Sequence, residues 1–197
     1  MFPSEEIQLN LPDADISYYP NFINNVEASF YYQKLLKTIP WQQDDITIFG
    51  KTYAQPRLTA LFANNNKPYR YSNITMYPHL FNNHLLAIKH KIETKHNINF
   101  TTCLANLYRD GQDSNGWHTD NEKELGEHPT IASISLGAPR YFHLKHRTDK
   151  TLRKKIVLGH GSLLLMKGKT QEHWLHQIAK TRKLIEPRIN LTFRIIK

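Results

Sequence analysis

The sequence predicts a mainly β protein with flanking helices (α+β), built around a double-sheet jelly-roll core. Two observations support this prediction. Helical stripes of apolar residues lie in the first half of the chain, and short β-like runs separated by turn signals follow Phe100. No internal repeat, low-complexity tract or Gly/Ser-rich linker interrupts the 197 residues. We therefore expect a single domain over 1–197, with N-terminal helices within about 1–100 and the core within about 101–197.

Two helices are expected in the N-terminal half. The first spans 25–39, where Asn24 provides an N-cap and Glu27 stands three residues later in the capping-box position. The second follows Pro78, because apolar residues there recur at helical spacing. They are Phe81, Leu85, Ile88 and Ile92. Both stripes are suited to packing against the apolar face of a sheet.

Seven short strands are expected after the second helix. They lie near 102–109, 130–136, 140–145, 155–158, 162–167, 174–178 and 189–196. Asp110 and Gly111 begin a polar loop that ends at Gly116 and leads into a further strand at His118. Short strands at such regular spacing are typical of a jelly roll, which places residues from facing strands around a rigid site.

Charge and cysteine content restrict the class of protein. The chain has 26 Lys and Arg against 17 Asp and Glu, a net charge of +9 that suits a polyanionic partner. Cys103 is the single cysteine, which excludes an internal disulfide and fits an inert core residue in a reducing compartment. No apolar run approaches the roughly 18 residues of a membrane span, and no secretory signal pattern is visible. We expect a non-secreted monomer without a membrane segment, cytoplasmic in a bacterium or nuclear in a eukaryote.

Positive charge is concentrated between positions 145 and 155. The basic residues there are Lys145, His146, Arg147, Lys150, Arg153, Lys154 and Lys155, with Asp149 as the single acid. Such a run is ordinary in a solvated loop, and in a nucleic-acid enzyme it can instead bind phosphates without reading sequence. The sequence leaves both interpretations open.

The segment His118-Thr119-Asp120 suggests a metal site. Side chains alternate between the two faces of a strand, so His118 and Asp120 would point to the same side. An imidazole and a carboxylate placed in this way supply two members of the 2-His-1-carboxylate triad found in non-haem Fe(II) oxygenases. The pattern alone is weak evidence in a chain with 11 His, and a second histidine must come from elsewhere.

The last expected strand has two different faces. Its polar residues are Arg188, Asn190, Thr192 and Arg194, and they alternate with Ile189, Leu191, Phe193 and Ile195. Arginines on an inner face need an anion, and a guanidinium binds a carboxylate in a bidentate fork. On a solvent-facing edge strand they would need none. The nearby His-x-Asp segment favours the inner-face interpretation, with a dicarboxylate co-substrate beside an iron.

Together these motifs resemble the AlkB-type 2-oxoglutarate and Fe(II)-dependent dioxygenases, nucleic-acid demethylases with a jelly-roll core. The similarity runs from about Tyr18 to Ile196 and is nearest to the duplex-DNA repair branch. The matching segments are QPRLTA at 55–60, NLYRDG at 106–111, HTD at 118–120, IASISLG at 131–137, HGS at 160–162 and PRINLTFR at 187–194. The resemblance implies Fe(II) as the metal, 2-oxoglutarate as co-substrate and O₂ as the oxidant.

The resemblance also implies roles for individual residues. The iron ligands would be His118, Asp120 and His176. The residues holding 2-oxoglutarate would be Asn106, Tyr108, Arg188, Asn190 and Arg194. Arg188 would bind the distal carboxylate, and Arg194 would lie nearer the metal.

Two histidines compete for the third ligand position. His173 and His176 are three residues apart, so on one strand they would face opposite ways and only one would reach the metal. The position that the family uses matches His176. His173 would then face outward or lie behind the ligands.

The segment before the core resembles the nucleotide-recognition lid of the family. Phe49, beside Gly50 at the tip of a hairpin over 44–51, would fill the gap left by an extruded base, unless it is a buried strand residue. Tyr71 would stack on that base, unless it is an ordinary tyrosine in a Tyr-rich chain. The implied substrate contacts are Phe49, Arg57, Tyr69, Tyr71 and Glu122. Among them, Arg57 would orient substrate or phosphate, and Glu122 would favour a cationic base.

The activity implied by the resemblance is oxidative demethylation of 1-methyladenine and 3-methylcytosine in alkylated DNA. It couples decarboxylation of 2-oxoglutarate to hydroxylation of the methyl group and release of formaldehyde. The alternatives are an RNA demethylase, a hydroxylase of protein or small molecules with the same iron site, and a non-catalytic nucleic-acid-binding protein. The last is disfavoured because every ligand position holds a competent residue.

Overall fold

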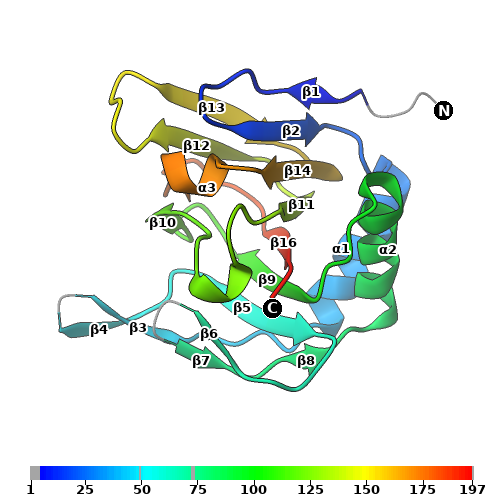
Figure 1. Cartoon of the computed structure of the whole chain (residues 1–197). Coiled ribbons are helices and arrows are strands. Elements are labelled where there is room, and N and C mark those ends of the chain that lie inside the picture. The colour runs from blue at the N-terminus through cyan, green and yellow to red at the C-terminus, as the bar shows by residue number, and fades with distance from the viewer. Residues whose placement is uncertain (1–4, 49, 72–73, 197) are drawn as a thin grey trace.

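Two β-sheets and two long helices make up the fold (Figure 1). The computed structural model describes residues 5–48, 50–71 and 74–196. The larger sheet contains, in spatial order, β1 (Ile7–Gln8), β2 (Asp15–Tyr19), β14 (Ser162–Lys167), β11 (Ile131–Gly137), β16 (Arg188–Arg194), β9 (Thr102–Tyr108), β5 (Leu58–Ala63) and β8 (His79–Leu80). The smaller sheet contains β10 (Asn115–His118), β15 (Trp174–Ile178), β12 (Arg140–His146) and β13 (Arg153–Leu158).

Short elements complete the chain. They are the hairpins β3 (Asp45–Ile48) with β4 (Lys51–Ala54) and β6 (Tyr69–Tyr71) with β7 (Ile74–Met76), the helical turn α3 (Thr170–His173) and a 3₁₀ turn (Lys123–Leu125). The first hairpin was expected from the sequence, and Figure 1 shows it projecting away from the sheets. The double-sheet jelly roll and its seven C-terminal strands are confirmed, with bounds within two residues of those expected.

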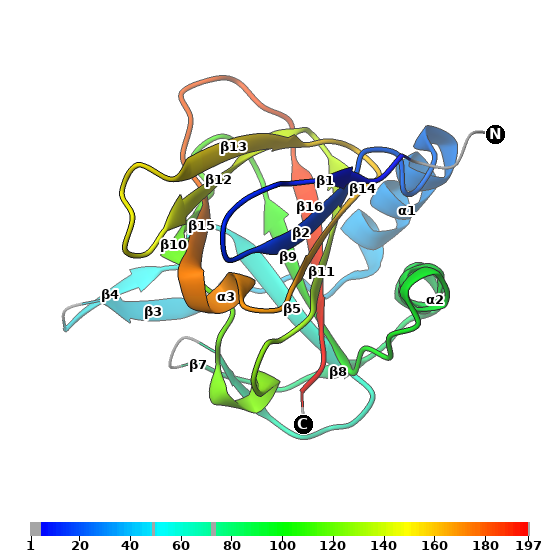
Figure 2. The same cartoon turned by 45° about the horizontal axis from the view of Figure 1, so that its top comes forward.

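The helices α1 (Asn25–Thr38) and α2 (Asn83–His96) begin at side-chain caps. The Asn24 side chain accepts a hydrogen bond of 3.0 Å from the Glu27 N–H, as the capping motif predicted. Figures 1 and 2 show the two helices beside one flank of the larger sheet. The apolar stripe of α2 is fully buried there at Leu85, Ile88 and Ile92. Helix packing therefore covers one face of the sheet and leaves its other face for the smaller sheet.

Strand β16 lies in the middle of the larger sheet, between β11 and β9. Its apolar residues Ile189, Leu191 and Phe193 belong to the core that the helices cover. Its polar residues line a cavity between the two sheets, at Arg188, Asn190, Thr192 and Arg194. The inner-face interpretation of the sequence is thus confirmed, and the edge-strand alternative is wrong.

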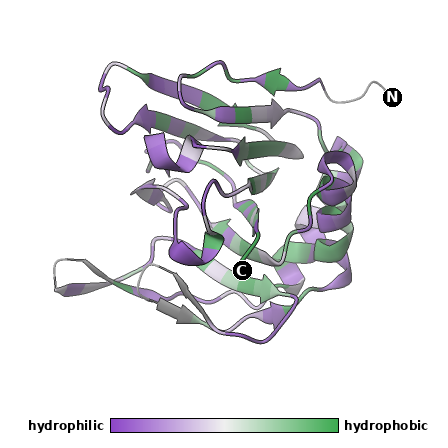
Figure 3. Ribbon diagram, viewed as in Figure 1, coloured by the Kyte–Doolittle hydropathy of each residue, from purple (hydrophilic) through white to green (hydrophobic). Residues whose placement is uncertain are grey.

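A second apolar core fills the rest of the space between the sheets. It includes Ile131, Phe142, Leu164, Trp174 and Ile178. Figure 3 shows apolar residues in green along the strands and in both long helices, whereas the loop between β12 and β13 is purple. The basic run expected near 145–155 coincides with this loop and its flanking strand ends.

The single cysteine of the chain lies in the core. Cys103 is fully buried in β9, and burial raises the pKa of its thiol well above the ordinary value. It is therefore an inert core residue, as the sequence suggested.

Among the described helices, none has both the length and the apolar character that a membrane crossing requires.

The turn before β14 depends on a glycine. Gly161 has a φ of +75°, and a Cβ built there would collide with the Ile23 carbonyl oxygen. We expect Gly161→Ala to lower the free energy of unfolding by about 3 kcal/mol, because it adds both backbone strain and overpacking. Urea denaturation measures this change. Gly159→Ala is the matched control, since a Cβ there meets only the Tyr18 hydroxyl at 3.7 Å, and an equal loss in both variants would contradict the argument.

Candidate metal centre

Three metal-ligating side chains meet between the sheets. His118 at the end of β10 pairs in register with His176 of β15, and their ring centroids are 4.2 Å apart. Asp120 follows two residues after His118. One ligand atom from each of the three residues lies within 4.8 Å of the others. The structure thus brings His176, rather than His173, to the predicted site.

The expectation that His118 and Asp120 share a strand is wrong. β10 ends at His118, and Asp120 lies in the loop that follows. Gln171 of α3 fixes this loop, because its side-chain oxygen accepts a hydrogen bond of 2.9 Å from the Asp120 N–H and its backbone carbonyl accepts one from the Thr119 hydroxyl. The loop turns both potential ligands to one side without strand periodicity.

Neighbouring groups hold both imidazoles in place. His118 Nδ1 lies 2.7 Å from the Gly116 carbonyl oxygen, which can only accept a hydrogen bond. Nδ1 therefore carries the proton, and Nε2 keeps a lone pair for a metal. The His176 ring stacks on Phe142 at a centroid distance of 5.1 Å.

The titration behaviour of the cluster favours metal ligation. Burial lowers the pKa of His176 to about 3, and burial also lowers the pKa of His118 despite the nearby Asp120 carboxylate. Burial by itself would raise the pKa of Asp120, but the positive Arg194 guanidinium, which also donates a hydrogen bond to the carboxylate, holds it below its usual value. Two neutral imidazoles and one carboxylate are the donor set that suits a non-haem Fe(II) ion.

We expect the metal-free protein to lose stability as pH falls from about 6.5 to 4.5. The folded-state pKa values of His118 and His176 lie below their unfolded values. In this window the unfolded chain therefore binds protons that the folded chain does not, so the free energy of unfolding declines. Urea midpoints at several pH values measure the slope, which should be shallower in His118→Ala. Equal slopes for the two proteins would contradict the effect at His118.

An ion pair links the metal centre to β16. Arg194 Nη2 lies 2.7 Å from Asp120 Oδ1, and their side chains are 4% and 3% exposed. This contact occupies one carboxylate oxygen of Asp120 and leaves the other for a metal. Arg194 is thus near the metal end of the cavity, as the resemblance implied.

Arg188, at the other end of β16, is a buried cation with little to bind. Its Nη2 donates to the Ser135 hydroxyl at 2.8 Å, whereas Nε and Nη1 have no hydrogen-bond partner among the described residues. Burial lowers the pKa of its guanidinium to about 10, and its charge lies 5.2 Å from the centre of the Tyr108 ring. Tyr108 lines the same cavity and interacts with the guanidinium, and the two donors that lack a hydrogen-bond partner among the described residues fit the carboxylate of a small ligand.

The remaining residues predicted to hold 2-oxoglutarate also line this cavity. They are Asn106, Tyr108 and Asn190. The Asn190 amide nitrogen donates to Ser133 and Ile134, and its oxygen accepts from Thr192, so this side chain is largely committed to the protein.

Arg57 is buried behind the cavity wall. Its Nε donates to the Asn106 side-chain oxygen at 2.9 Å, and its Nη1 donates to the Ser114 carbonyl at 3.2 Å. The side chain is 4% exposed, so its contacts orient Asn106, and a phosphate contact stays a prediction. The loop after β9 is held by another buried arginine, Arg140. Its guanidinium donates hydrogen bonds to the backbone carbonyls of Asp110, Asp113 and Ala179.

The residues predicted to contact substrate are only partly described. Phe49 lies outside the described residues, as do the side chains of Tyr69 and Tyr71 on β6. Glu122 stands just beyond the metal cluster. Burial raises the pKa of its carboxyl group, and its Oε2 is buried without a hydrogen-bond partner among the described residues. A cationic group could satisfy this carboxylate.

Sequence reasoning missed the residues that support the site. Gln171 fixes the Asp120 loop, Phe142 stacks on His176, and Ser133 and Ser135 hold Asn190 and Arg188, respectively. The serines had a detectable signal, because they recur with period two on an apolar strand and so share a face. Gln171 had none, since its role depends on the packing of a distant turn.

The sequence is similar to several known proteins. A family model described as the 2OG-Fe(II) oxygenase superfamily matches residues 15–194. The alpha-ketoglutarate-dependent dioxygenase alkB homolog 3 of Bos taurus is 42% identical over 189 residues, which cover 90% of this chain and 64% of that protein. The human DNA oxidative demethylase ALKBH2 is 34% identical over 192 residues, which cover 92% of this chain and 73% of that protein.

The fold also has a counterpart among solved structures. The structure of OsALKBH1 superposes with a TM-score of 0.60 over 98% of this chain and 99% of that chain, at 16% sequence identity. At that identity the likeness concerns the fold alone. The family match and the human relative go further, because they span most of the chain and most of the relative. The chain therefore belongs to the 2OG-Fe(II) oxygenase superfamily and, within it, to the AlkB family of dioxygenases.

Proposed function

We propose that this protein is an oxidative demethylase that removes N-linked methyl groups from 1-methyladenine and 3-methylcytosine in DNA. One observation carries the proposal: a buried cluster of two histidines and an aspartate shares a cavity with Arg188, two of whose guanidinium nitrogens have no hydrogen-bond partner in the described part of the chain. This arrangement can hold Fe(II) and the carboxylate of 2-oxoglutarate, the two ligands that the superfamily name implies.

The residues of the site have separate roles in binding the metal and the co-substrate. His118, Asp120 and His176 hold Fe(II), and their lowered pKa values keep all three in metal-binding protonation states. Arg188 binds and orients the distal carboxylate of 2-oxoglutarate, while Arg194 keeps Asp120 ionised. When bound, Fe(II) and 2-oxoglutarate supply the oxidising power that turns the methyl group into formaldehyde, with O₂ consumed and succinate and CO₂ released.

The net charge of the chain and its similarity to known demethylases both support nucleic acid as the substrate. A net charge of +9 favours binding to a polyanion, and the β12–β13 region offers exposed basic side chains beside aromatic rings. For example, Lys155 Nζ lies 3.6 Å from the centre of the exposed Tyr141 ring. DNA is chosen over RNA because the human relative is named a DNA oxidative demethylase. The chain spans 64% of the bovine relative, so activity and substrate are proposed for the part compared.

The test is reconstitution of the protein under anaerobic conditions with Fe(II) and 2-oxoglutarate. Air is then admitted with oligonucleotides that carry 1-methyladenine or 3-methylcytosine, in single- and double-stranded form. We expect loss of methyl mass and formation of succinate, both dependent on iron. Succinate without demethylation would overturn the nucleic-acid substrate, and demethylation of RNA alone would overturn the choice of DNA.

Glu122 gives the substrate proposal a residue-level test. We expect Glu122→Gln to lower kcat/KM about tenfold for 1-methyladenine. This base is cationic, and the variant loses the attraction between the Glu122 carboxylate and the positive charge of the base. The KM for 2-oxoglutarate should stay unchanged, since Arg188 rather than Glu122 binds it. An uncharged lesion such as 1-methylguanine is the control substrate. Equal losses for charged and uncharged lesions would refute a charge role for Glu122.

A further inference from the structure

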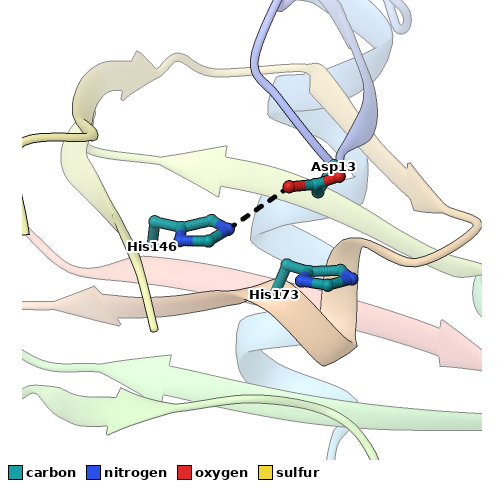
Figure 4. A group of neighbouring side chains, drawn as sticks. All are labelled: Asp13, His146 and His173. Carbon is teal, nitrogen blue, oxygen red and sulfur yellow. Dashed lines mark ion pairs between the residues drawn. The ribbon is translucent and has the colours of Figure 1, made fainter. Parts of the chain in front are cut away.

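A second group of metal-ligating side chains lies away from the first. It consists of Asp13, in the turn between β1 and β2, His146, at the end of β12, and His173, at the end of α3 (Figure 4). One ligand atom from each lies within 4.8 Å of the others. Figure 4 shows the His146 ring directed at the Asp13 carboxylate, with the His173 ring beside it. The two rings are nearly parallel, 9° apart in plane, with centroids 5.8 Å apart.

His146 places a buried ring nitrogen in this group. Its side chain is 7% exposed, and its Nε2 is buried without a hydrogen-bond partner among the described residues. Nε2 lies 3.6 Å from Asp13 Oδ2, which is too far for a hydrogen bond. Two ligand atoms that each lie about 2.1 Å from one metal ion are roughly 3–4 Å apart. The separation therefore fits an ion between them better than a direct contact.

The exposed member of the group is held in position. Asp13 has a φ of +55°, a left-handed conformation that few residue types adopt. Its neighbour Pro12 accepts a 2.8 Å hydrogen bond at its carbonyl oxygen from the Trp174 indole N–H, and Trp174 directly follows His173. The turn and His173 are thus fastened to each other, so the three ligands need little rearrangement to close on an ion.

Metal binding at His146 Nε2 requires a change of tautomer, because Nδ1 accepts a hydrogen bond from the Asp149 N–H and the neutral ring therefore carries its proton on Nε2. A metal on His146 Nε2 leaves the imidazole proton on Nδ1, and the Thr148 hydroxyl oxygen lies 3.2 Å from that nitrogen to accept it. The Asp149 N–H, which donates to Nδ1 at 3.1 Å, then gives up this bond. A second carboxylate oxygen, Oε2 of Glu172, lies 4.0 Å from His173 Nε2 and adds negative charge beside the group.

We propose that Asp13, His146 and His173 form a second metal site, which binds a divalent transition ion of the Zn²⁺ class. Two imidazoles and a carboxylate suit Zn²⁺ and its neighbours, whereas Mg²⁺ and Ca²⁺ prefer oxygen ligands alone. The bound ion clips the β1–β2 turn to the start of β15. Because His176 lies three residues further along, the clip also restrains the strand that holds a ligand of the first centre.

The test separates the two sites by disabling the first. Zn²⁺ binding is measured by equilibrium dialysis and elemental analysis in His118→Ala and in the His118→Ala/His173→Ala double variant. We expect one tightly bound Zn²⁺ in the former and at least tenfold weaker binding in the latter. His118→Ala/His90→Ala is the matched control, because His90 is exposed on α2 and belongs to neither group of potential ligands, and it should keep the ion.

A second variant guards against loss of folding. Asp13 is 55% exposed, so Asp13→Asn should fold, as circular dichroism can verify, while removing the charged ligand. Zn²⁺ should raise the Tm of His118→Ala and leave that of His118→Ala/Asp13→Asn nearly unchanged. The proposal is overturned if His118→Ala binds no Zn²⁺, or if the His173 and Asp13 double variants keep its full affinity. Neither result depends on the activity of the first centre.

Discussion

Replacing His118 or Asp120 with alanine will abolish succinate formation, but only Asp120→Ala will also destabilise the fold strongly. Both variants lose a proposed ligand of the metal centre. Asp120 additionally forms a buried ion pair of 2.7 Å with Arg194. Removing one partner of such a pair costs about 3–5 kcal/mol, because the other charge remains buried. Urea denaturation of the metal-free variants and succinate assays with added Fe(II) measure the two effects.

An isosteric variant separates the two roles of this carboxylate. Asp120→Asn keeps an oxygen that can accept a hydrogen bond from Arg194 but loses the charge. We expect it to recover part of the lost stability and none of the activity. An active Asp120→Ala enzyme would refute the ligand assignment. Equal stability of Asp120→Ala and the wild-type protein would refute the energetic role of the ion pair.

The second large effect concerns co-substrate binding. Arg188→Met should weaken 2-oxoglutarate binding by roughly 100-fold or more, since two charge-assisted hydrogen bonds of about 1.5–3 kcal/mol each are lost. The metal-free variant should nevertheless be as stable as the wild type or more so. Nε and Nη1 of Arg188 lack partners among the described residues, and an apolar side chain of similar volume avoids their burial.

Arg140→Met provides the matched control. Arg140 is also buried, but its guanidinium nitrogens donate to three backbone carbonyl oxygens in the loop after β9 and beyond β15. We expect this variant to lose stability and to keep most of its affinity for 2-oxoglutarate. Titration calorimetry and urea denaturation on both variants test the contrast. Unchanged co-substrate affinity in Arg188→Met would contradict its role.

The sequence predicted those features that depend on local periodicity. The α2 stripe at Leu85, Ile88 and Ile92 follows from 3.6-residue spacing, and both faces of β16 follow from two-residue spacing. Because β16 alternates strictly, the cavity-facing positions of Arg188 and Arg194 were predictable before any tertiary contact was known. The choice of His176 depended on family resemblance rather than on spacing.

Features that depend on long-range packing were not predictable. β2 and β5 were missed, because their short apolar runs form strands only by pairing with β14 and β9. The position of Asp120 beyond the end of β10 depends on Gln171, which is 51 residues away in the chain. Similarly, the buried contact of Arg57 with Asn106 arises from the pairing of β5 with β9, which the sequence did not predict.

The two guanidinium nitrogens of Arg188 that lack a hydrogen-bond partner among the described residues would connect folding to the supply of 2-oxoglutarate. A ligand that binds only the folded chain stabilises it by about 1.4 kcal/mol for each tenfold rise in free concentration above its Kd. If 2-oxoglutarate satisfies the donors that the protein leaves open, the fraction of molecules that unfold falls as this metabolite accumulates. Proteolysis samples the unfolded fraction, so the lifetime of the protein in a cell would follow the supply of 2-oxoglutarate. The cellular concentration of 2-oxoglutarate would thereby influence how much of the protein escapes degradation.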